Sequence, residues 1–269
     1  MIKVNHEVPF CLLNASKKFN DYEFCLPHLL DQNEQYKQHF LDAKEEGRYI
    51  IMDNSLHELG TAYDTNRLLY WVTELEPDEF IVPDVWENYS KTVVNAREWV
   101  NIPFPKNTTK VAVIQSNTRA TVSVCTQVLK DLGYKKLAYS YGANHYKKNN
   151  PNLPDYLAKA LGRVDTISYL YEHGILTDRD NVHLLGTACP FEFNFYSKFK
   201  FIKTIDTSNP IMAALEGVKY DIYGIHPKPE ANMNDYADVE FSNVDLDLIF
   251  HNTNMFKNYF NNNLCRIML

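Results

Sequence analysis

Eight short runs of apolar, often β-branched residues recur along the chain, and amphipathic segments separate several of them. Strands that alternate with helices favour a parallel sheet, and eight such repeats favour an α/β fold of the (β/α)8 TIM-barrel type. An open, doubly wound sheet is the alternative. The predicted strands are 9–13, 49–52, 79–82, 110–114, 136–140, 182–186, 201–205 and 220–225.

The predicted helices carry apolar residues on one face and have recognisable ends. In the segment 119–132, apolar residues recur at i, i+3, i+4 and i+7, and Gly133 stands where the helix should end. The other predicted helices are 31–46, which ends before Gly47, 64–75, which opens with Asp64, and 163–173, which ends before Gly174.

Length and composition indicate one globular domain. The chain has 269 residues, of which 45% are hydrophobic, enough for one sizeable core. We expect a single domain over 1–269, with 230–269 as a peripheral C-terminal segment. The sequence shows neither a membrane-spanning apolar stretch nor a signal peptide, so we expect a soluble, cytoplasmic protein without membrane contact.

Positive charge is concentrated in one window although the net charge is -7. Between Lys130 and Arg163 seven basic residues face two acidic ones, and five tyrosines are interleaved with them. Such a mixture suits phosphate contacts and base stacking, whereas a solvated helix face rich in lysine is the alternative. The residues predicted to bind nucleic acid are Lys135, Lys136, Lys147, Lys148 and Arg163.

Polar residues follow the predicted strands, where the functional side chains of a barrel project. They include Asp53, Asp84, Gln115 and Asp206, and the run 136–140 ends in Ser140 before Tyr141 and Gly142. Carboxylates that converge raise one another's pKa, which favours a site over packing. The alternative is that Asp53 and Asp206 only cap the helices that follow.

Two carboxylates are what substitution at the anomeric carbon of a sugar requires. One attacks C1′ to form a covalent glycosyl-enzyme, and the other transfers the proton of the departing and arriving base. A further carboxylate and an amide can read the donors and acceptors of a purine, and guanine suits this pair better than adenine.

Six motifs occur in an order that carries a family resemblance. They are IIMDNS at Asp53, IVPDVWEN at Asp84, AVIQSN at Gln115, AYSYGAN at Gly142, HLLGTACP from His183 to Pro190, and IDTSNP at Asp206. Over about 49–217 the chain resembles the tRNA-guanine transglycosylase superfamily, and most of all its short viral members that insert 7-deazaguanine into DNA. The resemblance implies that Asp206 is the nucleophile and Asp53 the general acid/base. It also implies that Asp84, Gln115, Ser140, Tyr141 and Gly142 hold the base.

The chain departs from the members that act on tRNA. Asn54, Ser55 and Leu56 stand in place of their Ser-Gly-Gly run, and Ile211 stands where they have a basic residue. Their zinc site of three cysteines and one histidine has no counterpart, so we expect neither a metal nor another cofactor. His57 and Glu58 fit either partners of Asp53 or the start of a surface helix, and His145 is expected to be an exposed loop residue.

The sequence therefore predicts an enzyme that exchanges guanine in DNA for a free 7-deazaguanine base, with homodimer formation possible. An enzyme acting on duplex must extrude its target base. The alternatives are the same chemistry on tRNA, a catalytically silent barrel that binds nucleic acid or a partner protein, and a barrel glycosidase.

Overall fold

A computed structural model describes residues 2–105 and 107–260, and its eight strands form one sheet in the order β1-β8-β7-β6-β5-β4-β3-β2. The neighbouring pairs β1/β8, β2/β3, β3/β4, β4/β5 and β5/β6 are all parallel. With helices between the strands, this is the topology of a (β/α)8 barrel of the TIM type, so the predicted fold class is confirmed. The strands are β1 (Lys3–Asn5), β2 (Glu23–Cys25), β3 (Ile50–Met52), β4 (Glu79–Ile81), β5 (Thr109–Ile114), β6 (Lys136–Ser140), β7 (Val182–Leu185) and β8 (Ile202–Asp206).

Side-chain caps and left-handed glycines define the ends of several helices. Asp64 accepts N–H groups from the first turn of α5, as its position in the sequence predicted. Gly47, Gly133 and Gly174 all have positive φ, at the helix ends where they were expected. The α-helices are α1 (Leu13–Ser16), α2 (Pro27–Gln32), α3 (Glu34–Glu45), α4 (Leu56–Leu59), α5 (Thr65–Leu75), α6 (Tyr89–Asn101), α7 (Arg119–Asp131), α8 (Asp155–Glu172), α9 (Asn209–Leu215) and α10 (Leu246–Tyr259). The 3-10 helices are η1 (Phe10–Leu12), η2 (Asn144–Asn149), η3 (Pro190–Phe195), η4 (Met233–Tyr236) and η5 (Phe241–Asn243).

The chain separates into two compact units. Unit 1 comprises the described parts of 1–21, 141–179 and 184–269, and unit 2 comprises 22–140 and 180–183. The expectation of a single domain over 1–269 stays a prediction, and 261–269 lie outside the described residues. None of the helices in the described part of the chain is long and apolar enough to span a membrane.

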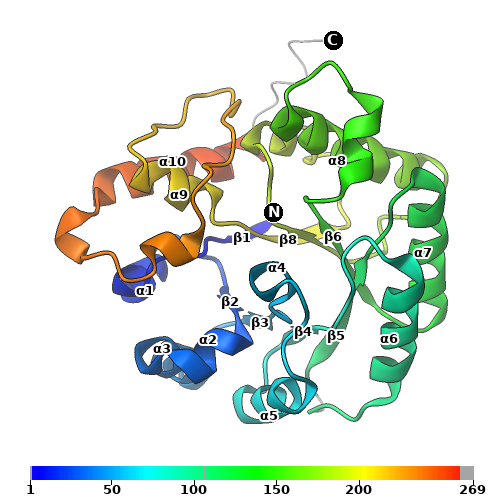
Figure 1. Cartoon of the computed structure of the whole chain (residues 1–269), viewed down its shortest axis with the longest axis horizontal. Helices are drawn as coiled ribbons and strands as arrows, with labels where there is room; N and C mark the ends of the chain where they lie inside the picture. The colour runs from blue at the N-terminus through cyan, green and yellow to red at the C-terminus, as the bar shows by residue number, and fades with distance from the viewer. Residues whose placement is uncertain (1, 106, 261–269) are drawn as a thin grey trace. The chain divides into compact units, whose positions relative to one another are not determined.

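Unit 2 contains strands β2 to β6 and their helices. Figure 1 shows α3, α5, α6 and α7 on the outer side of these strands. Ile51, Phe80 and Val111 are fully buried on successive strands, as expected for a parallel sheet covered on both faces. The same sheet buries charge, because Lys136 on β6 forms an ion pair with Glu79 on β4.

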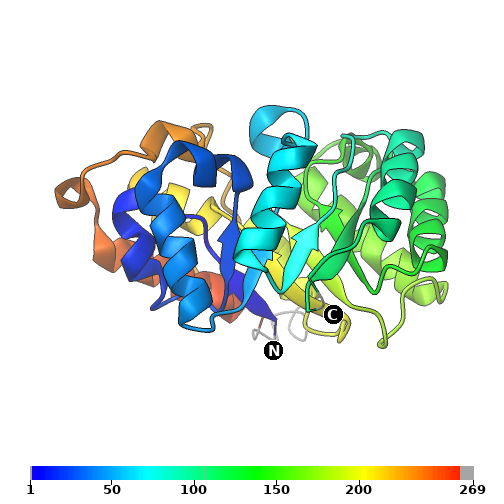
Figure 2. The same ribbon diagram turned by 90° about the horizontal axis from the view of Figure 1, so that it is seen from below.

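Unit 1 contains β1, β8 and the C-terminal helices. Helices α9 and α10 pack against each other (Figures 1 and 2). Ile249, Phe256 and Tyr259 on α10 are fully buried, so this helix belongs to the core of the unit. The preceding η4 and η5, within the segment expected to be peripheral, contain no buried residue.

Two predicted strands are wrong, and two real strands were not predicted. The run 9–13 forms η1 and the start of α1. Strands β1 and β2 have three residues each and contain polar residues, so they lack the apolar pattern of a strand. In β2 the polar residue is Glu23, which is buried because Arg48 Nε donates to its Oε1 at 2.6 Å. Its ion-pair partner, rather than hydrophobicity, permits the burial of this strand.

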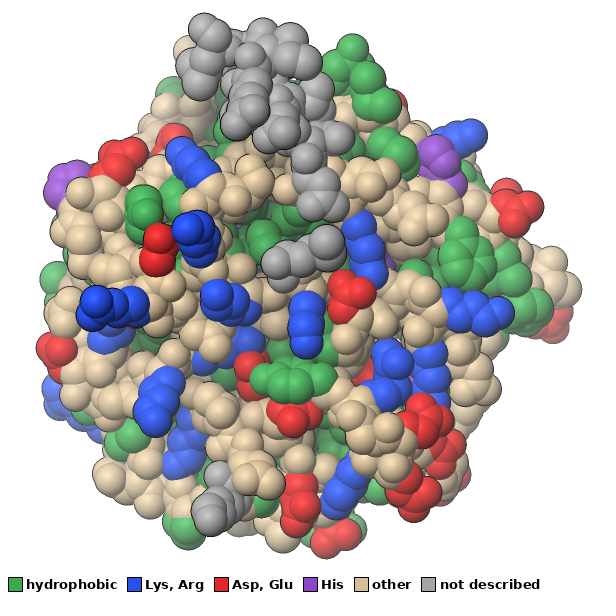
Figure 3. Space-filling model, turned by 180° about the vertical axis from the view of Figure 1, so that it is seen from behind, with side chains coloured by type: hydrophobic (Ala, Val, Ile, Leu, Met, Phe, Trp, Pro, Cys, Tyr) green, Lys and Arg blue, Asp and Glu red, His purple; other side chains and the backbone are tan. Residues whose placement is uncertain are grey.

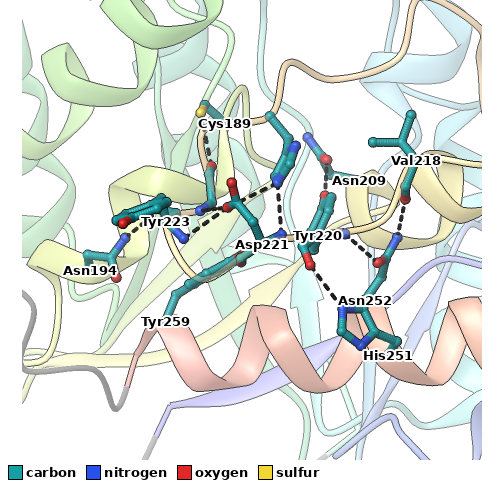
Figure 4. Close-up of polar contacts among 12 residues, drawn as sticks. Cys189, Asn194, Asn209, Val218, Tyr220, Asp221, Tyr223, His251, Asn252 and Tyr259 are labelled. Carbon is teal, nitrogen blue, oxygen red and sulfur yellow. Dashed lines mark hydrogen bonds and ion pairs between the residues drawn. The ribbon is translucent and has the colours of Figure 1, made fainter.

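The predicted strand 220–225 is a tight turn (Figure 4). Asp221 Oδ1 accepts the N–H groups of Tyr223 at 2.9 Å and Gly224 at 3.0 Å, which competes with strand pairing. Tyr259 Oη donates to the carbonyl oxygen of Asp221 at 2.5 Å. Gly224 has a φ of 74°, a conformation that does not occur in a regular strand.

Candidate functional site

Asp53 lies in the turn that follows β3, and its position was predicted. Its N–H donates to the carbonyl oxygen of Cys25 at 2.9 Å, which continues the pairing with β2. Its Oδ2 accepts the N–H of Ser55 at 3.1 Å. Ser55, not Asp53, is the N-cap residue of α4. The carboxylate of Asp53 therefore forms a local turn rather than the helix cap considered as the alternative.

Ser55 has a φ of 62°, an unusual conformation for a residue with a side chain. Its Oγ lies 2.8 Å from Nδ1 of His28, and both residues are buried. Burial lowers the pKa of His28, so its ring is neutral near pH 7 and either atom can donate, depending on the tautomer. His28 thus supports the turn that carries Asp53.

Asp84, after β4, is the centre of a buried hydrogen-bonded cluster. Asn54 Nδ2 donates to Asp84 Oδ1 at 2.8 Å, and Gln115 Nε2 donates to Asp84 Oδ2 at 2.7 Å. All three side chains are at most 4% exposed. The structure therefore brings together the predicted Asp84 and Gln115, and adds Asn54. We call Asn54, Asp84 and Gln115 the amide–carboxylate cluster.

The pKa of Asp84 is raised by its buried environment. Burial raises the pKa of this carboxyl to about 6, although the N–H donors of Asn54 and Gln115 act in the opposite direction. The sequence predicted an upward shift from converging carboxylates, whereas desolvation is its main cause here. A carboxyl that titrates near neutral pH is typical of functional sites.

Backbone strain is concentrated around the same cluster. Of the three non-glycine residues with positive φ in the described chain, Ser55 and Glu87 both adjoin it. Glu87 has a φ of 48°, and its N–H donates to Gln115 Oε1 at 2.9 Å. Such conformations cost about 1–3 kcal/mol each and tend to occur at functional sites. The strain therefore supports a functional role for this end of β3, β4 and β5.

Asp206 is the last residue of β8, in unit 1, and is half-buried. Asn5 on β1 is its partner in the parallel pair, and the N–H of Thr207 donates to the carbonyl oxygen of Asn5 at 3.0 Å. At the start of α9, the N–H of Asn209 donates to Thr207 Oγ1 at 3.0 Å. Ser208, and not Asp206, is the N-cap residue of α9, so Asp206 does not hold the capping position considered as the alternative. The joint action of Asp206 and Asp53 stays a prediction.

The predicted base-holding residues after β6 fall into both units. Ser140 ends β6 in unit 2, whereas Tyr141 and the buried Gly142 belong to unit 1. The N–H of Tyr141 donates to the carbonyl oxygen of Leu185 at 3.0 Å. Lys228 Nζ donates to the Tyr141 hydroxyl at 3.2 Å, so the tyrosine ring is held in place.

Two residues predicted to bind nucleic acid are buried, which corrects their assignment. Lys136 is 1% exposed and paired with Glu79. Arg163 is 0% exposed, and its Nη2 lies 2.6 Å from Glu192 Oε1. Neither side chain can neutralise a phosphate from these positions.

The remaining basic residues of the window are more accessible. Lys135 and Lys148 are exposed, and Lys147 is half-buried with its Nζ 2.6 Å from Asp155 Oδ2. On the face drawn in Figure 3, Lys and Arg side chains are interspersed with Asp and Glu side chains. Three of the five tyrosines in the window are buried in the core, namely Tyr134, Tyr139 and Tyr146. The window is therefore less basic at its surface than its composition indicated.

The two histidines singled out from the sequence differ in outcome. His57 is exposed at the start of α4, which matches the surface-helix alternative, and its ring centroid lies 6.2 Å from that of Trp86. His145, expected to be exposed, is 7% exposed in η2, with its ring 4.5 Å from that of Tyr146. The histidine at the Asp53 turn is instead His28, which no spacing in the sequence linked to Asp53.

No group of three or more His, Cys, Asp or Glu residues that could hold a metal ion is found within 2–105 and 107–260. Comparison with known proteins adds no assignment, because no family model and no curated protein matches the chain. What the chain does must therefore be argued from its own side chains.

Proposed function

We propose that the chain is a base-exchange transglycosylase that replaces guanine in DNA with a 7-deazaguanine, as the sequence resemblance implies. The observation that carries the proposal is the amide–carboxylate cluster. Both amides direct N–H groups at Asp84, so the carboxylate keeps acceptor capacity for N–H donors of a ligand. The N1–H and 2-amino groups of guanine and 7-deazaguanine are such donors.

The proposed reaction is a double displacement at C1′ of the nucleotide. The Asp206 carboxylate attacks C1′, the electron pair of the C1′–N9 bond goes to the departing guanine, and protonated Asp53 gives the base a proton. The incoming 7-deazaguanine then loses its N9 proton to Asp53 and attacks C1′. This step releases the Asp206 carboxylate and retains the sugar configuration.

Burial of Lys136 and Arg163 removes part of the argument for DNA over tRNA. Exposed Lys135 and Lys148 remain as candidate phosphate contacts. The test is incorporation of a labelled 7-deazaguanine into duplex DNA, single-stranded DNA and tRNA in parallel. We expect label in DNA. Label only in tRNA would overturn the DNA assignment, and label in none of the three would refute the proposal.

Variants test the roles of the two aspartates separately. Asp206→Asn should abolish exchange while nucleic-acid binding persists, because the amide keeps the shape but not the nucleophilicity. Asp53→Asn should lower turnover at least ~100-fold, the scale of general acid–base catalysis. Asp238→Asn, at an exposed position of unit 1, is the control and should keep full activity. Full activity in either active-site variant would contradict the corresponding role.

A further inference from the structure

We infer that Asn54 is a positioning residue that determines base specificity, because it fixes Asp84 as an acceptor of N–H groups. The inference rests on the proposed function and deepens it. In the sequence, Asn54 is notable only because it stands where the enzymes that act on tRNA have the first residue of their Ser-Gly-Gly run.

All hydrogen-bonding groups of the Asn54 amide have partners that fix its orientation. Nδ2 donates to the carbonyl oxygen of Val82 at 3.0 Å and to Asp84 Oδ1 at 2.8 Å. Oδ1 accepts the N–H of Leu56 at 2.9 Å. Rotating the amide by 180° would place its oxygen against two acceptors, so only the observed orientation is favourable.

Gln115 is fixed in the same manner from the other side. Its Nε2 donates to Asp84 Oδ2 at 2.7 Å, and its Oε1 accepts the N–H of Glu87 at 2.9 Å. Each oxygen of Asp84 thus receives one side-chain amide N–H, and the backbone at Asp84 supplies a further hydrogen bond to the carboxylate. A carboxylate has about four acceptor positions, so acceptor capacity remains for a ligand, and neither oxygen can donate while the group is ionised.

This polarity selects the ligand. A guanine-type edge offers adjacent N–H donors and satisfies the carboxylate, whereas the adenine edge presents the acceptor N1 beside its amine. An acceptor facing a buried carboxylate leaves both groups unsatisfied, which is the strongest source of discrimination between similar ligands. Asn54 matters because its N–H group helps to keep Asp84 ionised despite its burial.

Two substitutions remove this donor in different ways. Asn54→Leu keeps the approximate shape without the N–H group, and Asn54→Ser shortens the side chain. The matched control is Asn88→Ala, which removes the N-cap of α6 in the same unit but no donor to Asp84. The control should lose stability as a cap variant does and keep its base selectivity.

The experiment measures binding of 7-deazaguanine and of 7-deazahypoxanthine, which lacks the 2-amino group, to the full chain between pH 5 and 9 by ligand-observed NMR. The unsubstituted protein should prefer 7-deazaguanine and lose affinity as the pH falls through about 6, where Asp84 becomes protonated. Both Asn54 variants should bind 7-deazaguanine roughly ten-fold more weakly, discriminate less between the two bases, and lose affinity at a higher pH. A role limited to stability would not move the pH midpoint.

The outcomes separate the two proposals. If the unsubstituted protein binds 7-deazaguanine selectively, and both Asn54 variants keep its selectivity and pH midpoint, the role of Asn54 is overturned while the proposed function stands. If the unsubstituted protein binds neither base at any pH, the proposed function fails and the role of Asn54 fails with it.

Discussion

His6 should make the stability of the chain depend on pH. Its ring is buried. It packs edge-on against Phe256, with ring centroids 5.5 Å apart. Burial and the nearby charge of Lys257 lower its pKa from 6.5 to about 3, offset in part by the backbone at Thr207. The folded chain therefore resists protonation of His6, whereas the unfolded chain does not.

The magnitude follows from linkage between protonation and folding. The pKa of His6 is lower in the folded chain than in the unfolded chain. His6 therefore has no effect on the free energy of unfolding above about pH 6.5, and it lowers this free energy as the pH falls from 6.5 towards 3. At about 1.4 kcal/mol per pH unit, the loss is about 2 kcal/mol at pH 5 and about 4 kcal/mol at pH 3. Asp84 acts in the opposite direction. Because its pKa is raised in the folded chain, its protonation increases the free energy of unfolding as the pH falls from about 6 to about 4.

The assay must therefore compare variants rather than pH values alone. Urea unfolding of the unsubstituted chain and of His6→Phe at pH 7 and pH 5 gives four free energies of unfolding. His6→Phe should be less destabilised by the lower pH, by about 2 kcal/mol. The control, Phe256→Leu, alters the same packing without a titrating group, so it should lower stability equally at both pH values. If His6→Phe and the unsubstituted chain show the same pH dependence, burial does not suppress protonation of His6 and the reasoning is wrong.

Two further predictions concern unit 1. Arg163→Met should lower the free energy of unfolding by about 3–5 kcal/mol, because it leaves the fully buried Glu192 without its cation, and adding Glu192→Gln should recover part of this loss in urea unfolding. Gly186→Ala should raise the KM for the free base, because φ is 61° and a Cβ would lie 2.4 Å from the Tyr141 ring. The control is Gly133→Ala, which is also at positive φ but has no atom within 4 Å of its added Cβ. It should lower stability without changing the KM. Equal KM values for the two glycine variants would contradict the predicted role of Tyr141.

The strands in which apolar, aromatic or β-branched residues predominate could be predicted, and the short strands β1 and β2 could not. Strands β3 to β8 match predicted runs, because residues with a high β-propensity predominate in each run. Glu23 in β2 is charged, and its burial depends on Arg48 and His39, which both contact its carboxylate. The run 220–225 is apolar, yet Asp221 and Gly224 make it a turn, and Ile222 is 56% exposed.

The same distinction applies to the candidate site. Asp84 and Gln115 could be found because the ends of strands in this fold carry polar side chains. The role of Asn54 depends on the direction of one amide, which no sequence spacing reveals. Lys136 and Arg163 were misassigned because their partners, Glu79 and Glu192, are 57 and 29 residues away, so counting charges could not show that they are neutralised.

The composition of the two units also has a consequence for how the chain is made. Unit 2 is almost one continuous stretch, so its strands β2 to β6 can pair while the ribosome is still adding later residues. Unit 1 joins Lys3 on β1 to Thr204 on β8, so β1 cannot pair with its partner strand until β8 has been synthesised. During that interval the backbone of β1 lacks its β8 partner, so this strand is open to pairing with other chains.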